Sequence, residues 1–113
     1  MSVIYHIAIA SDWAAAQRDG GYTTSTRGVS LDEQGFIHAS TSEQVAPVAN
    51  LYYKGLPDLV VLVIDTERVG PEIRYEQVPG WDAPFPHIYG PLNVDAVAGI
   101  RPLAAGPDGG FTF

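Results

Sequence analysis

The run Leu59–Asp65 constrains the fold of this chain more than any other stretch. Its sequence, Leu-Val-Val-Leu-Val-Ile-Asp, is apolar without interruption up to the final aspartate. A half-exposed strand alternates apolar and polar residues, whereas a strand that is buried on both faces does not. The run therefore predicts the central strand of a sheet that is covered on both sides.

Other short runs predict the rest of the sheet, because their apolar or alternating patterns are those of strands. They lie at residues 3–9, 23–25, 36–39, 72–78, 85–89 and 96–103. Apolar spacing predicts one helix from Ser11 to Gly20 and another from the Ser40 region to about Lys54. We expect a single domain, residues 1–113, of the α+β class. It would have a mixed, twisted sheet of about six strands, split around a cleft, with two helices outside.

Composition excludes several classes of partner. The net charge is −7, from 13 acidic and 6 basic residues. The basic residues are scattered, so a polynucleotide partner is not expected, although a mononucleotide or dinucleotide needs only one or two of them. Without cysteine, the chain has no disulfide framework. The apolar run Val3–Ala10 is too short to span a membrane and follows no basic region, so we expect a cytoplasmic protein without a membrane partner.

The stretch Gly35–Glu43 is the first candidate site. Its sequence, Gly-Phe-Ile-His-Ala-Ser-Thr-Ser-Glu, begins as an apolar strand and ends as the first turn of a helix. Ser40 followed by Glu43 is typical of a capping box, with Thr41 and Ser42 as competing caps. These hydroxyls are better explained as caps than as nucleophiles. His38 would leave the strand beside a helix N-terminus, and such a corner can bind an anion or a sugar phosphate.

Three histidines, His6, His38 and His87, lie in apolar strand sequence. A buried imidazole needs either a hydrogen-bond partner or a ligand. A structural hydrogen bond is enough to explain any one of these histidines in an apolar strand. It explains the presence of all three less well. Zinc held by three histidines is a further alternative. No two of them have the His-x-x-x-His spacing of ligands on a helix, and no metal is expected.

Three other positions leave alternatives open. Glu76, on an alternating strand, is by default a solvated or paired carboxylate, and a catalytic role is the second interpretation. Trp81, in a proline-rich loop, either anchors the loop or offers a face on which a nucleobase stacks. Arg27 lies in the polar loop 20–32, and a loop of that length in a small domain is often functional.

Four motifs carry a resemblance to a known family. They are Ile-Tyr-His-Ile-Ala at 4–8, Gly-Phe-Ile-His-Ala-Ser-Thr at 35–41, Val-Ala-Asn-Leu-Tyr-Tyr at 48–53, and Phe-Pro-His-Ile-Tyr-Gly-Pro-Leu at 85–92. Together they resemble the uncharacterised domain family 952 over nearly the whole chain. That family is similar in layout to the ADP-ribosyltransferase fold of poly-ADP-ribose polymerases and RNA 2′-phosphotransferases.

The resemblance implies roles for the strand histidines. His6 would hold a ribose, and His38 would line the nicotinamide cleft. The third strand of that fold normally carries a glutamate that orients the ribose hydroxyls, or another polar residue in the divergent phosphotransferase branch. Here that strand offers His87 and Tyr89 instead, so Glu76 could replace the glutamate only by proximity. The catalytic candidates are His6, His38 and Glu76, and the ligand-binding candidates are Ser40, Thr41, His87, Tyr89 and Arg27.

The expected function is that of an ADP-ribosyltransferase-like protein that binds or processes NAD, or a related ribose-phosphate small molecule. NAD is the candidate substrate, and the enzyme would be a glycosyl or ADP-ribosyl transferase or would cleave NAD. The missing third-strand glutamate motivates an alternative, a non-catalytic binding or interaction module on the same fold. The acceptor substrate and the oligomeric state do not follow from the sequence.

Overall fold

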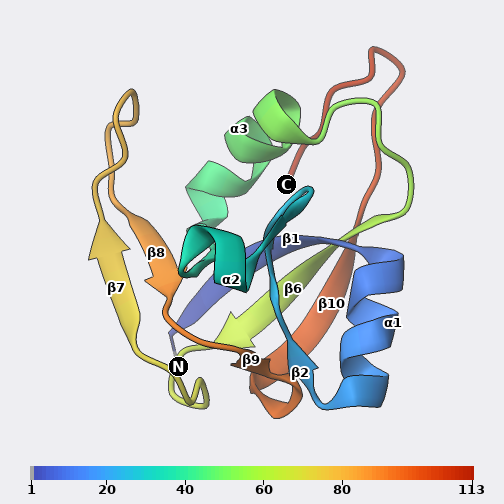
Figure 1. The fold of residues 1–113 in the computed structure, drawn as a ribbon. Coiled ribbons are helices and arrows are strands. Elements are labelled where there is room, and N and C mark those ends of the chain that lie inside the picture. Colours follow the sequence, from blue (N-terminus) through green and yellow to red (C-terminus); the bar gives the residue numbers. More distant parts are fainter. Residues whose placement is uncertain (1) are drawn as a thin grey trace.

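The computed structural model describes residues 2–113 and has two three-stranded sheets (Figure 1). The first has the order β1-β6-β10, with β1 at Val3–Ile9, β6 at Leu59–Asp65 and β10 at Val97–Leu103. β6 pairs antiparallel with a neighbour on each edge. The prediction that Leu59–Asp65 is a central strand is confirmed.

The second sheet has the order β5-β8-β7, with β5 at Ile37–His38, β8 at Phe85–Ile88 and β7 at Ile73–Glu76. One bridge joins it to the first sheet. The Tyr5 N–H donates to the Ser40 carbonyl at 2.8 Å, and the Ser40 N–H donates to the Tyr5 carbonyl at 2.7 Å. The strand pairs within residues 2–113 are antiparallel, so the expectation of a mixed sheet is wrong in strand direction.

Three α-helices and two short strand pairs complete the described chain, which is of the predicted α+β class. The helices are α1 at Ala10–Asp19, α2 at Leu31–Gln34 and α3 at Ser42–Tyr52, and a 3-10 turn covers Val94–Ala96. The short pairs join β2 (Gly21–Tyr22) to β9 (Leu92–Asn93), and β3 (Thr24–Thr26) to β4 (Val29–Ser30). None of the helices described is long and apolar enough to cross a membrane.

Helices α1 and α3 explain why β6 has no polar face. Trp13 of α1 packs with Leu62 in one buried cluster, and Val45 of α3 packs with Val61 in another. Neighbouring residues of a strand point to opposite faces of the sheet, so the two clusters lie on opposite sides of β6. Both faces of this strand are therefore in apolar surroundings.

The structure corrects the expected start of one helix and adds another helix that the sequence did not predict. Helix α1 has Ile9 rather than Ser11 as its N-cap, and the Asp58 carbonyl accepts the Ala10 N–H at 2.9 Å. Its end at Gly20, which has a left-handed φ of 88°, is as predicted. Helix α2 lies in the polar loop where no helix was expected, and the Ser30–Glu33 capping box stabilises it.

Candidate functional site

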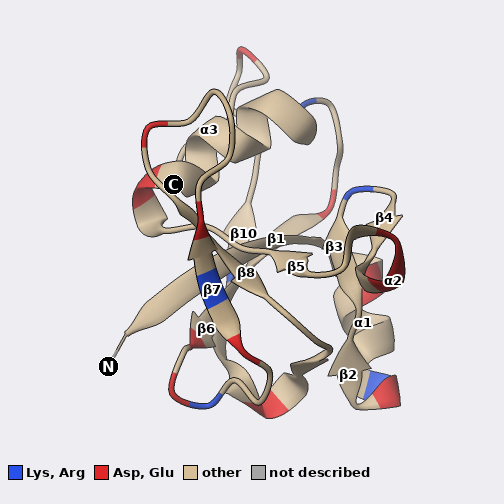
Figure 2. Ribbon diagram, turned by 60° about the vertical axis from the view of Figure 1, so that its left-hand side comes forward, with Lys and Arg blue, Asp and Glu red and all other residues tan. Residues whose placement is uncertain are grey.

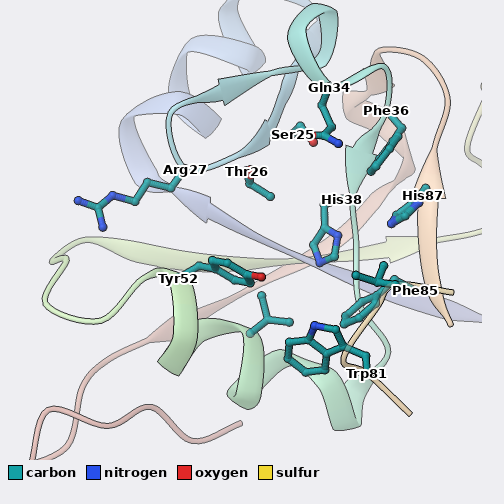
Figure 3. Close-up of a pocket in the computed structure, with 12 residues that line it drawn as sticks. Ser25, Thr26, Arg27, Gln34, Phe36, His38, Tyr52, Trp81, Phe85 and His87 are labelled. Atoms are coloured by element: carbon teal, nitrogen blue, oxygen red, sulfur yellow. The ribbon is translucent and has the colours of Figure 1, made fainter. Parts of the chain in front are cut away.

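A cavity of about 300 Å³ opens between α3, the second sheet, β3 with the turn that follows it, the end of α2 and the loop before β8 (Figure 3). We call it the histidine pocket and define it by the residues that line it. They are Ser25, Thr26, Arg27, Gln34, Phe36, His38, Val48, Tyr52, Val78, Trp81, Phe85 and His87. Three of the predicted site residues, His38, His87 and Arg27, are among them.

His38 ends β5 and points into the pocket (Figure 3). Its ring centroid lies 4.7 Å from that of Phe85 and 5.5 Å from that of His87. Burial, with smaller contributions from His6 and His87, lowers the pKa of His38 from 6.5 to about 4. At pH 7 this imidazole is therefore neutral, and it can hydrogen-bond a ligand without bringing a positive charge.

His87 lies against a hydrogen-bonded cluster from β7 and β8. Its Nδ1 is 2.7 Å from Glu76 Oε1, and the Tyr89 hydroxyl donates to the same oxygen. The Phe36 ring stacks on the imidazole, with centroids 3.9 Å apart and planes at 16°. The bonds from Tyr89 and then His87 lower the pKa of Glu76, and the bond to Glu76 raises the pKa of Tyr89. Glu76, held by Tyr89, thus contacts the Nδ1 side of the His87 ring, and neither residue lines the cavity.

His6 lies in the core and does not line the histidine pocket. Its Nδ1 is 2.5 Å from the His38 carbonyl, which can only accept, so Nδ1 carries the proton. Its Nε2 then accepts a hydrogen bond from the Tyr22 hydroxyl at 2.8 Å. Burial lowers the pKa of His6 from 6.5 to about 4 and raises the pKa of Tyr22. Both ring nitrogens of His6 therefore have protein partners, and one of them holds the backbone of His38 in place.

Buried polar atoms without a hydrogen-bond partner gather at the histidine pocket. Within residues 2–113, four buried side-chain atoms have none: Trp13 Nε1, Ser25 Oγ, His38 Nε2 and His87 Nε2. Three of these four belong to residues that line the pocket. Nearly all buried polar groups in proteins are hydrogen-bonded, so three exceptions at one cavity indicate that a ligand or water supplies the missing partners.

The predicted hydroxyl residues lie outside the pocket. Thr41, rather than Ser40, is the N-cap of α3, because the backbone of Ser40 is held in its bridge to Tyr5. Gln44 Oε1 accepts the Thr41 N–H at 2.9 Å, so the capping box is formed by Thr41 and Gln44 and not by Ser40 and Glu43. Neither hydroxyl residue lines the cavity.

Arg27 lies in the turn between β3 and β4 at the edge of the pocket. Its backbone N–H donates to the Tyr53 hydroxyl at 3.2 Å, which fixes the turn against the end of α3. In Figure 3 its side chain extends away from His38 and toward solvent. It is the one Lys or Arg among the residues that line the cavity, so it is the nearest cation for an anionic part of a ligand.

A three-histidine zinc site does not form in the part of the chain that the structure describes. No group of three or more His, Asp or Glu side chains there could hold a metal ion. His6 has both ring nitrogens bonded within the protein, which removes it as a ligand.

Sequence reasoning missed several pocket residues. Ser25 is fully buried in β3, yet its Thr-Ser-Thr context is typical of an exposed strand. Phe36 precedes β5 and was assigned only to the strand, although its ring covers His87. Trp81 both anchors its loop and lines the cavity, with its ring edge-on to Phe85 at 5.0 Å. Only the spacing of Phe36 and His38 on one strand face signals that both could reach the same cavity.

One comparison with known proteins gives a family, and another gives solved structures of the same fold. The family model described as "Protein of unknown function (DUF952)" matches residues 7–100. No curated protein matches the chain. Two crystal structures of protein CC0527 from Caulobacter crescentus, one of them a double mutant, are each 32% identical, with TM-scores of 0.86 and 0.85. Each match covers 98% of this chain and 94% of that one. A solution NMR structure of CC0527 is 34% identical and has a TM-score of 0.79. The match covers 97% of this chain and 91% of that one.

Proposed function

This chain belongs to the family described as "Protein of unknown function (DUF952)", and we propose that its histidine pocket binds NAD or a related ribose-phosphate small molecule. One observation carries the proposal. Three buried polar atoms without partners, on Ser25, His38 and His87, converge on a cavity that aromatic rings line. A concave, mostly apolar pocket with a few placed polar groups is the usual form of a small-molecule site.

The walls of the pocket favour a flat ring. Phe36, Trp81 and Phe85 bring three aromatic rings to the cavity, and Tyr52 brings a fourth. Such rings stack with a heteroaromatic group such as nicotinamide or a nucleobase. The volume of about 300 Å³ is small for a ligand site, so it suits one ring of a dinucleotide rather than the whole molecule.

The polar groups that line the histidine pocket, Ser25 and the two imidazoles, favour a neutral amide as their ligand group over an anion. The pKa of His38 near 4 keeps its imidazole uncharged at pH 7. A carboxamide has both donors and an acceptor, and could therefore satisfy Ser25 Oγ together with an imidazole nitrogen. The phosphates would lie outside the cavity, where Arg27 is the nearby cation.

The charge distribution favours a small molecule over a polymer. The net charge is −7, and Figure 2 shows Lys and Arg on separate elements rather than along one surface. Polynucleotide binding depends on many phosphate contacts, whereas one dinucleotide needs few.

Binding without turnover is the second candidate function. The observation behind it is that no carboxylate lines the histidine pocket, since Glu76 is engaged by His87 and Tyr89. A carboxylate that orients the ribose hydroxyls is therefore not supplied from the place where an ADP-ribosyltransferase would carry it. A module that only binds the ligand needs no such group.

Calorimetry and saturation-transfer NMR with NAD, ADP-ribose and nicotinamide test the proposal. We expect at least one to bind with a Kd below about 1 mM, which is about −4 kcal/mol. Arg27→Ala should weaken the binding of NAD and of ADP-ribose but not the binding of nicotinamide, because only the first two compounds carry phosphates. Arg18→Ala, on α1 and outside the pocket, is the matched control and should change none of them. Absence of binding by all three compounds at millimolar concentration would overturn the proposal.

A further inference from the structure

The pairing of β7 with β8 places a carboxylate behind one of the pocket histidines. Glu76 lies opposite Phe85 in the antiparallel register, which makes it a diagonal neighbour of His87. Diagonal neighbours on one face are within reach of long side chains, and here the carboxylate reaches Nδ1 at 2.7 Å. The Tyr89 hydroxyl holds the same carboxylate oxygen, and Phe36 stacks on the ring. The imidazole is therefore fixed in both orientation and plane.

This arrangement decides which nitrogen carries the proton. The pKa of Glu76 is lowered, so the carboxylate stays ionised at neutral pH and can only accept. The proton of a neutral His87 must then lie on Nδ1, and Nε2 has a free lone pair. That Nε2 is buried, has no partner within residues 2–113, and belongs to a residue that lines the cavity and is 4% exposed.

We propose that His87 is the proton-accepting catalytic residue of the histidine pocket and that Glu76 is its positioning residue. The inference rests on the proposed function, because the proton comes from water or a hydroxyl that attacks a ligand bound there. The two residues thus exchange the roles that the sequence predicts. The sequence makes Glu76 a catalytic candidate and His87 a ligand-binding candidate, whereas here His87 is catalytic and Glu76 positions it. An imidazole oriented by a carboxylate, with its other nitrogen facing the substrate, is the arrangement of a general base.

For NAD the step balances with water as the second reactant. The bond between the ribose anomeric carbon and the nicotinamide ring nitrogen breaks, and its electron pair stays on that nitrogen, which becomes neutral. A bond forms from the anomeric carbon to the water oxygen. The proton lost by that water goes to His87 Nε2, and the imidazolium later releases it to solvent. The products are ADP-ribose and nicotinamide.

The groups around His87 support a transient positive charge on it. Glu76 faces Nδ1 from β7 with a negative charge, and Tyr89, the residue after β8, holds that carboxylate. The Arg74 guanidinium lies 4.4 Å from the Tyr89 ring centroid and is also paired with Glu72 at 3.0 Å. His38 of β5 is neutral at pH 7, so it adds no opposing charge there.

Nitrogen-15 NMR of the imidazoles tests the first half of the inference without any ligand. In the neutral form of His87 we expect the proton on Nδ1 and a bare Nε2. Glu76→Gln should weaken this preference, because an amide can donate to Nδ1 as well as accept from it. Glu72→Gln, which removes a nearby carboxylate that does not touch His87, is the matched control and should leave the tautomer unchanged. A proton on Nε2 of neutral His87 would overturn the inference.

Release of nicotinamide from NAD tests the second half. We expect the wild-type protein to release it, and His87→Gln to lower the rate by about 10²-fold or more, the usual contribution of a general base. Glu76→Gln should also lower the rate, Glu76→Asp should restore part of it, and Glu72→Gln should match the wild type. If NAD binds and the wild-type protein releases no nicotinamide, this inference fails while the proposed binding function stands. If NAD, ADP-ribose and nicotinamide all fail to bind, the proposed function itself fails.

Discussion

His6 and His87 are the same residue type in the same kind of apolar strand, and the structure gives them opposite environments. His6 lies in the first sheet, where a backbone carbonyl and the Tyr22 hydroxyl occupy both ring nitrogens. His87 lies in the second sheet and lines the histidine pocket. Glu76 occupies one of its nitrogens, and the other is buried without a partner among residues 2–113. Burial is nearly equal, with 2% and 4% of each residue exposed.

The comparison teaches that burial alone does not distinguish a structural histidine from a functional one. What separates the two is the number of polar atoms that remain without a protein partner. By that measure His6 belongs to the folded core, and His38 and His87 are the candidates for the proposed site. Each region then responds differently to mutation and to pH.

Removing His6 should have the largest effect, and the effect should be on stability. His6→Ala leaves the His38 carbonyl and the Tyr22 hydroxyl without partners and opens a cavity in the core. We expect a loss of about 4 kcal/mol in the free energy of unfolding. Thermal denaturation should show a fall in Tm of more than about 15 °C. A variant that melts within a few degrees of the wild type would remove the distinction between the two regions.

Acidification should destabilise the ligand-free protein through His6 and His38. Each has a folded-state pKa near 4, below the unfolded value of 6.5. The unfolded chain therefore binds more protons between pH 6.5 and pH 4, and stability is lost as the pH falls through that window. From pH 7.5 to pH 5 we expect a loss of about 2 kcal/mol for each histidine.

Chemical denaturation across this pH range measures the loss. The His38→Ala variant should keep only the pH-dependent loss that comes from His6. Between pH 7.5 and pH 5 its free energy of unfolding should therefore fall by about half as much as that of the wild type. Stopping at pH 5 keeps most of the titration of Glu72 and Glu76 out of the measurement. Their lowered folded-state pKa values affect stability only as the unfolded chain takes up protons near the ordinary pKa of 4.5, which lies below pH 5. A stability that does not change between pH 7.5 and pH 5 would show that these imidazoles are not buried in a neutral form.

His38→Ala should affect binding more than stability. The change removes an imidazole whose Nε2 has no hydrogen-bond partner among residues 2–113. We expect ligand affinity to fall by about 1–3 kcal/mol, while the free energy of unfolding at pH 7.5 falls by less than about 1 kcal/mol. Calorimetry with NAD and denaturation of the same preparation give both values. Normal binding by a variant that melts far lower would assign His38 to the core with His6.

Ser25→Ala should have the smallest effect on stability. The buried hydroxyl lacks a partner, so its removal should leave the free energy of unfolding unchanged or raise it by up to about 1 kcal/mol. Ser30→Ala is the contrasting control, because the Ser30 hydroxyl caps α2 and its loss should cost about 1 kcal/mol. Denaturant titration compares the two variants. A clear loss of stability in Ser25→Ala would mean that its hydroxyl has a partner in solution.

The main strands could be predicted from sequence because their patterns are local. The bounds of β1 and β6 follow from apolar runs that need no knowledge of the rest of the fold. Features set by distant contacts could not be predicted. Ser40 was expected to cap α3, but its backbone is bonded to Tyr5, and the cap moves to Thr41. The ADP-ribosyltransferase-like layout stays a prediction.

The candidate site was predictable to a similar extent. The apolar contexts of His38 and His87 predicted a buried imidazole at each position that needs a partner or a ligand, and the structure puts the two ring centroids 5.5 Å apart. His6 has the same context, and only the position of Tyr22 shows that it is satisfied. The contact between Glu76 and His87 depends on the register of β7 with β8, which no local pattern specifies.

The most direct test of this account is a ligand titration followed by nitrogen-15 NMR of all three imidazoles. As NAD or ADP-ribose is added, the account predicts that the Nε2 signals of His38 and His87 shift together and saturate at the same ligand concentration. The signals of His6 should stay nearly in place, because both of its nitrogens are already bonded within the core. Shifts of His6 as large as those of the other two, or no shift in any of the three, would contradict the account.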